Sequence, residues 1–171
     1  GIVEEQGIAE GAGLTGMNWT PYVTFVENVL AKARYASRYS GLPALADDSD
    51  ICVSALGLAS ARYAGEPKSA ERNNLKLIET LKNQSDRRAY YYCVIVLVRH
   101  ADDPQPIIVD GRGTVKSSIN REAKANSAMI RIFCAEFNKI SAELTAEQRN
   151  RVSHCSQALA KLVEILRAGK F

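Results

Sequence analysis

The sequence predicts an α/β fold built around a long mixed β-sheet, and three segments carry that prediction. Apolar residues recur at helical spacing over residues 24–39, as in an amphipathic helix packed on a core. Residues 88–99 are apolar or aromatic at both alternating sets of positions, which predicts a central strand covered on both faces. A last amphipathic helix ends before Gly169. We expect one domain that spans residues 1–171.

The helices are expected to begin at recognisable caps. Thr24 is followed three residues later by Glu27, so each side chain can bond the other residue's unsatisfied backbone N–H group. Thr145 and Gln148 repeat this capping box near the C-terminal end. A further amphipathic helix is expected at residues 67–82.

Shorter apolar runs predict the remaining strands. Residues 42–46 and 51–56 are expected to form two strands joined by an acidic turn. Residues 106–109 are expected to pair back on the central strand as a hairpin, with Gly111 as a breaker. The sequence of residues 120–140 is ambiguous, so no element is predicted there.

Composition excludes several classes of protein. The chain is 46% hydrophobic and 24% charged, which fits a globular domain and excludes disordered and fibrous chains. A net charge of +3 is too small to predict binding of nucleic acid. The longest apolar run, residues 90–98, is too short to cross a membrane, and the start lacks the pattern of a signal peptide. We therefore expect a protein that is not secreted and does not bind membranes.

The cysteines indicate a reducing compartment. Cys52, Cys93, Cys134 and Cys155 are widely spaced, form no C-x-x-C pair, and two of them lie inside apolar runs. This pattern favours reduced core thiols over disulfides, and the separated positions predict no zinc site. Reduced thiols favour a cytoplasmic location.

The segment Leu45-Ala46-Asp47-Asp48-Ser49 places two carboxylates and a hydroxyl where an apolar run ends. At the carboxyl edge of a sheet, such hard oxygen ligands suit Mg²⁺ and a phosphorylated substrate. Asp and Ser are also ordinary turn residues, so a solvated turn explains the segment equally well. The residues alone leave both interpretations open.

Four motifs, in order along the chain, resemble the family of inosine triphosphate pyrophosphatases. They are TFVENVLAKA at residues 24–33, LADDS at 45–49, SARYAG at 60–65 and RNRVSH at 149–154. They are similar to the family's T-F-x-E-N-A-x-x-K-A, L-A-D-D-S-G, S-A-R-Y-A-G and K-N-x-x-S-H-R. The resemblance implies helices and a sheet arranged in two lobes around a central cleft, and a homodimer.

The resemblance also implies Mg²⁺-dependent hydrolysis of ITP, dITP and XTP to the monophosphate and pyrophosphate. Asp48 would be the catalytic base, and Glu27, Asp47 and Asp48 the metal ligands. Substrate contacts would come from Ser49, Lys32, Arg62, Arg149, Ser153, His154 and Cys155. Glu27 has a complete structural explanation as part of its capping box, and Lys32, Arg62 and Arg149 would otherwise be solvated surface cations.

Three departures from the family pattern stand beside these motifs. Residues 1–19 hold no S-N-N-x-x-K phosphate-binding turn, and residues 112–131 hold no F-G-Y-D-P segment. Cys155 replaces the arginine that follows Ser-His, so we expect weaker discrimination between ITP and ATP. These departures support an alternative function, a catalytically impaired nucleotide-binding protein or a structural dimeric remnant of the family.

Overall fold

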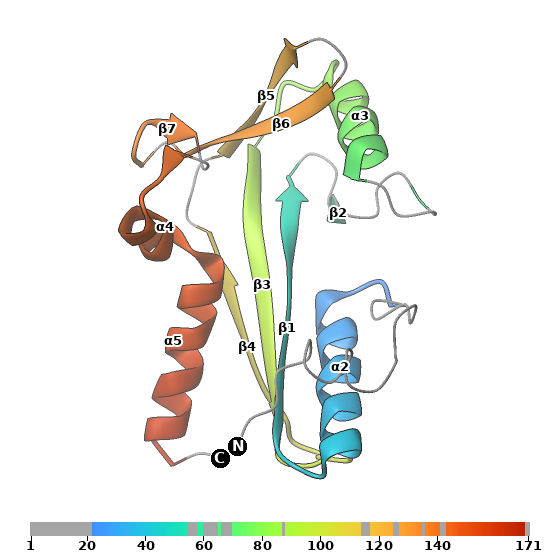
Figure 1. Ribbon diagram of the computed structural model, residues 1–171, viewed down its shortest axis with the longest axis vertical. Coiled ribbons are helices and arrows are strands. Elements are labelled where there is room, and N and C mark those ends of the chain that lie inside the picture. Colours follow the sequence, from blue (N-terminus) through green and yellow to red (C-terminus); the bar gives the residue numbers. More distant parts are fainter. Residues whose placement is uncertain are drawn as a thin grey trace. The chain divides into compact units, whose positions relative to one another are not determined.

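The computed structural model describes residues 22–54, 58–59, 65, 70–86, 88–113, 117–124, 127–134, 136–140 and 143–169. The elements are α2 (Phe25–Ser40), β1 (Ala44–Val53), β2 (Leu58–Ala59), α3 (Ala70–Leu81), β3 (Arg88–Val98), β4 (Ile107–Arg112), β5 (Ser117–Lys124), β6 (Ser127–Cys134), β7 (Lys139–Ile140), α4 (Ala146–Val152) and α5 (His154–Arg167) (Figure 1). They confirm the α/β class. Within the described part of the chain, every helix is too short or too polar to span a membrane.

The chain divides into two compact units, and each strand or helix is described within its own unit. Unit 1 comprises Gly1–Ser49, Cys93–Gly111 and Cys155–Phe171, and unit 2 comprises Asp50–Tyr92 and Arg112–His154. The long strands β1 and β3 contribute residues to both units.

β3 lies beside β1 in the sheet and also pairs with β4, which confirms the expected hairpin. β4 continues through Gly111 to Arg112, so this glycine does not end the strand as predicted. The pairings of β1 with β2, β3 with β5, β5 with β6 and β6 with β7 are all antiparallel. None of these four strand pairings is parallel, although the sequence predicted a mixed sheet.

One strand, β1, replaces the acidic turn and the two strands predicted around it, although residues 55 and 56 of that prediction lie outside the described residues. It runs without interruption through Asp47, Asp48 and Ser49. Ala44 and Ala46 are buried, whereas Asp47 is exposed, as alternation along a strand requires. Asp and Ser favour turns as isolated residues, but the neighbouring strand β3 supplies backbone partners that a local reading cannot include.

In unit 1 the helices α2 and α5 bury apolar stripes. α2 begins at the predicted capping box, with Thr24 as its N-cap, and ends at Gly41, whose φ of 69° is the left-handed conformation that favours glycine. Its fully buried residues include Val29 and Ala33. α5 packs with β3 and β4 in a cluster formed by Cys93, Ile95, Leu97, Val109, Ala158 and Leu162.

β3 is the central strand that its two apolar faces predict. Every residue from Cys93 to Val98 is buried. In unit 2 the buried residues Leu77 and Leu81 of α3 pack with Val53 and Ala89, which confirms that the predicted second helix is amphipathic. The first residues of that prediction, 67–69, lie outside the described residues.

Unit 2 also contains two segments from the C-terminal half of the chain whose sequence signals can be compared with the structure. The segment 120–140, whose sequence was ambiguous, contributes to β5 and β6 and contains the short strand β7. The second predicted capping box, Thr145 with Gln148, begins α4. α4 ends at Val152 with Ser153 as its C-cap, and the last helix, α5, begins at His154.

Asp103 organises the connection between β3 and β4 from a fully buried position. Its carboxylate accepts hydrogen bonds from the backbone N–H and Nε of Arg99 and from the backbone N–H of Gln105, each at 2.9 Å. The hydrogen bonds from the Arg99 side chain, opposed by burial, hold the pKa of this carboxyl below its usual range. A depressed folded pKa stabilises the fold above the unfolded pKa of about 3.9, and this stabilisation is lost as the pH falls toward the folded value.

We predict that Asp103→Asn lowers the free energy of unfolding by about 1–3 kcal/mol near neutral pH, because the backbone and guanidinium donors of this connection lose a buried charged acceptor. The difference from the parent should shrink below about pH 3.9, where the ordinary aspartate pKa lies. Urea denaturation near neutral pH and in acid measures both values. A difference that stays constant across this range would show that the Asp103 charge does not stabilise the connection.

Candidate active site

A lysine of α2 contacts the acidic stretch of β1 within unit 1. Nζ of Lys32 lies 3.6 Å from Oδ1 of Asp48 and donates a hydrogen bond of 3.2 Å to the backbone carbonyl of Asp47. The two side chains are only 10% and 21% exposed. Charges this shielded are screened by salt much less than surface pairs. The structure thus brings together three of the predicted site residues, Lys32, Asp47 and Asp48.

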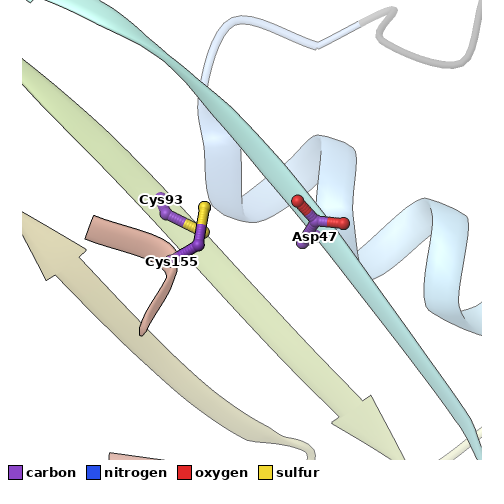
Figure 2. Close-up of side chains that lie close together, drawn as sticks. All are labelled: Asp47, Cys93 and Cys155. Carbon is purple, nitrogen blue, oxygen red and sulfur yellow. The ribbon is translucent and has the colours of Figure 1, made fainter. Parts of the chain in front are cut away.

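The neighbouring carboxylates of Asp47 and Asp48 serve different faces of β1, because successive side chains alternate along a strand. Asp48 meets Lys32, whereas Asp47 lies with the thiols of Cys93 and Cys155 (Figure 2). Leu45, two residues before Asp47, packs against the cluster that contains Cys93. The predicted turn would have left both carboxylates free to converge, but the strand separates them.

Glu27 performs the structural role that its spacing predicted. Its Oε2 accepts hydrogen bonds from the backbone N–H and Oγ1 of Thr24, at 3.3 and 2.6 Å. Five residues turn a helix through about 140°, so Glu27 and Lys32 lie on different sides of α2. Glu27 lines a groove along α2 with Tyr22 and Arg34. Its second predicted role, as a metal ligand, stays a prediction.

Of the three carboxylates predicted to bind a metal, Asp48 has the surroundings that best suit a hard cation. Among the residues that the structure describes, Glu27, Asp47 and Asp48 do not form a group with ligand atoms all within 4.8 Å of one another. Mg²⁺ is commonly held by one or two carboxylates, with waters and substrate phosphates completing its coordination. Asp48, half-buried and offering carboxylate oxygens, fits that pattern without the other two.

Cys155 lies in the first turn of α5 and packs against the cluster of Cys93 in unit 1. Burial, together with the neighbouring Cys155 thiol, raises the pKa of Cys93. The widely spaced cysteines predicted no zinc site. In the folded chain, however, the sulfurs of Cys93 and Cys155 and a carboxylate oxygen of Asp47 all lie within 4.8 Å of one another. Residues from β1, β3 and α5 meet only in the folded chain, so no local spacing could signal the cluster.

In unit 2, His154 stacks on Tyr91 of β3. The two ring centroids are 5.0 Å apart and the planes are inclined by only 11°. Tyr91 was read from the sequence as an ordinary core position of an apolar strand, and nothing in the strand pattern distinguishes it from its neighbours. The backbone carbonyl of Tyr91 also accepts a 2.8 Å hydrogen bond from the N–H of Gly113.

The remaining predicted residues have varied surroundings. Ser153 caps α4, and its backbone N–H donates to the carbonyl of Asn150. Arg149 is exposed and donates to the backbone carbonyl of Leu144 at 3.3 Å. Ser49 is exposed on β1. Arg62 lies outside the described residues, and the substrate contact expected of His154 stays a prediction.

Comparison with known proteins gives consistent matches. The model of the Ham1 family matches residues 17–165, a span that includes the divergent residues 112–131. A dITP/XTP pyrophosphatase of Nitrosomonas europaea is 57% identical over 153 residues, covering 85% of this chain and 74% of that protein. The dITP/XTP pyrophosphatase of Chromobacterium violaceum is 53% identical over 154 residues, covering 86% and 78%.

Solved structures give the same family by a different route. A HAM1 protein from Coxiella burnetii superimposes with a TM-score of 0.73 at 31% identity, covering 98% of this chain and 97% of that chain. The Ham1 protein of Staphylococcus aureus gives a TM-score of 0.72 at 32% identity, covering 95% and 85%.

Proposed function

The chain belongs to the Ham1 family, and on that premise we propose that it is a nucleoside triphosphate pyrophosphatase, a hydrolase of acid anhydrides. Its substrates would be dITP, ITP and XTP, and its products the nucleoside monophosphate and pyrophosphate. The observation that carries the proposal is the shielded contact between Lys32 and Asp48, because a carboxylate and a cation held side by side suit a base and a phosphate contact. Mg²⁺ and a homodimeric assembly are further parts of this proposal.

The proposed chemistry is attack of water on the α-phosphorus. Asp48 would take the proton from the water as the new P–O bond forms, and the bond to the bridging oxygen would break to release pyrophosphate. Lys32 would hold the Asp48 carboxylate in place and present positive charge to the phosphate oxygens. A bound Mg²⁺ would neutralise negative charge on the phosphates.

The proposed phosphate contacts extend beyond this pair. Ser49 is exposed on β1 and follows Asp48 in the chain, and its hydroxyl is proposed as a further phosphate contact. Arg62 and Arg149 could each clamp a phosphate with the forked donors of a guanidinium group. Glu27 and Asp47 are proposed to contribute negative charge near the metal.

Base recognition is proposed for the start of α5. His154 would donate a hydrogen bond to the 6-keto oxygen of hypoxanthine or xanthine, with Ser153 beside it. Stacking on Tyr91 restricts the orientation of the imidazole ring, which favours a directed hydrogen bond. Adenine carries an amino donor at this position, so two donors would face each other. Cys155 cannot supply the guanidinium donors of the residue it replaces.

The test is pyrophosphate release from ITP, dITP, XTP and ATP, with and without Mg²⁺. We expect release that requires the cation, and a kcat/KM for ITP at least about tenfold above that for ATP, since one hydrogen bond to the base is worth roughly this factor. Equal values for ITP and ATP would contradict the base-reading role. Tight binding of ITP without any release would favour the alternative, an impaired nucleotide-binding protein.

A further inference from the structure

Asp47, Cys93 and Cys155 bring three metal-ligating side chains together in unit 1 from three separate segments (Figure 2). The sulfur atoms of both cysteines and one carboxylate oxygen of Asp47 all lie within 4.8 Å of one another. We propose that these three residues form a binding site for one thiophilic divalent cation of the Zn²⁺ and Cd²⁺ class. This inference does not rest on the proposed hydrolysis.

The upper limit of 4.8 Å on the separations can be compared with what a tetrahedral ion requires. Zinc lies about 2.3 Å from thiolate sulfur and about 2.0–2.2 Å from carboxylate oxygen. Tetrahedral angles then place the ligand atoms roughly 3.5–3.8 Å from one another. Atoms already within 4.8 Å need only small side-chain rotations to reach this arrangement. Three protein ligands would leave the fourth position to water, as in open zinc sites.

Packed elements position the sulfur ligands. Cys93 is fully buried on the central strand, and β3 shares its apolar cluster with α5, which carries Cys155. Asp47 lies on β1, the strand next to β3. Because the cysteines are held by the core, little conformational entropy is lost when they bind an ion.

The surroundings also give an ion access to the cluster. Cys155 is half-buried and Asp47 is exposed, so the site borders solvent on the side of the carboxylate. On binding, each thiol would release its proton to the buffer and bind as a thiolate. Two thiolates and a carboxylate carry three negative charges, which a divalent cation largely neutralises.

The ligand chemistry distinguishes this cation from Mg²⁺. Thiolates are soft ligands that select zinc-like ions, whereas Mg²⁺ demands near-octahedral oxygen coordination. Excess Mg²⁺ should therefore not displace Cd²⁺ from these three residues. A cation held by the carboxylates of β1 alone would be displaced.

In the experiment, the full chain is titrated with Cd²⁺ in a buffer that contains a phosphine reductant to keep the thiols reduced. Excess Mg²⁺ is present and nucleotide is absent. Thiolate-to-cadmium absorption in the ultraviolet and calorimetry report binding. We expect one equivalent of Cd²⁺ with the absorption of two thiolates. Cys155→Ser should weaken binding by at least about 100-fold, since losing even an outer-sphere partner of a metal ligand costs 10- to 100-fold. Asp47→Asn should weaken it about tenfold.

Cys52→Ser is the matched control, because Cys52 is also half-buried but lies in unit 2, outside the cluster. It should bind Cd²⁺ as the parent does. Cys93 is a core residue and its replacement could impair folding, so the half-buried Cys155 is the decisive position, with circular dichroism to verify the fold. The proposal is overturned if Cys155→Ser binds Cd²⁺ as tightly as the parent, or if binding produces no thiolate absorption.

Discussion

Asp48→Asn is expected to lower kcat for ITP hydrolysis by about 10²–10⁴-fold, the usual contribution of a positioned general base. Asparagine keeps the size of the side chain but cannot accept a proton from water at neutral pH. The KM for ITP should change much less, because the substitution removes an interaction that matters chiefly in the transition state. The fold should persist, since asparagine has nearly the same size and shape as aspartate.

Steady-state pyrophosphate release over a range of ITP concentrations measures both constants, and thermal unfolding monitors the fold. Asp110→Asn is the matched control. Asp110 also pairs with a lysine in unit 1, Lys161, at 3.0 Å, but both side chains are about half exposed and neither belongs to the proposed site. This control should retain the parent's kcat. If Asp48→Asn also retained it, another group would have to be the base.

The elements predicted correctly from the sequence are those whose signals are local. The capping box of Thr24 and Glu27 and the left-handed Gly41 act within a few residues of the ends of α2, so neighbouring letters suffice to place them. The central strand β3 could also be predicted from its own residues. It is apolar at both alternating sets of positions, which only burial on both faces explains.

β1 shows where a local reading fails. Asp47, Asp48 and Ser49 have the composition of a turn, yet the pairing of β1 within the sheet keeps the strand extended through all three. Strand formation depends on partners that are distant in sequence, and these partners can override the turn propensity of individual residues. The error mattered for the site, because a strand sends the two carboxylates to opposite faces.

Some contacts of the candidate site could be predicted from local motifs, whereas others could not. Lys32 and Asp48 entered the prediction through separate motifs, and the structure places them in contact. The stacking of His154 on Tyr91 and the meeting of Cys93 with Cys155 depend on how distant segments fold together. No spacing in the sequence indicates either contact, so only a structure could reveal them.

Lys32→Met should lower kcat/KM for ITP by about 10²–10³-fold, the effect of removing one preorganised donor to a charged transition state. Methionine retains most of the length and apolar stem of lysine, so packing of α2 on β1 should be preserved. The ammonium that contacts Asp48 and the Asp47 carbonyl is lost. Kinetics on ITP together with thermal unfolding separate a loss of catalysis from a loss of fold.

Lys161→Met supplies the comparison, because Lys161 contacts Asp110 at the surface and such exposed pairs contribute at most about 1 kcal/mol. Its kcat/KM should match that of the parent. The double variant of Lys32→Met with Asp48→Asn tests whether the two residues act as a unit. Residues that share one step lose less together than the sum of their separate losses. Fully additive losses would mean that Lys32 binds phosphate independently of Asp48, and that their contact has no catalytic role.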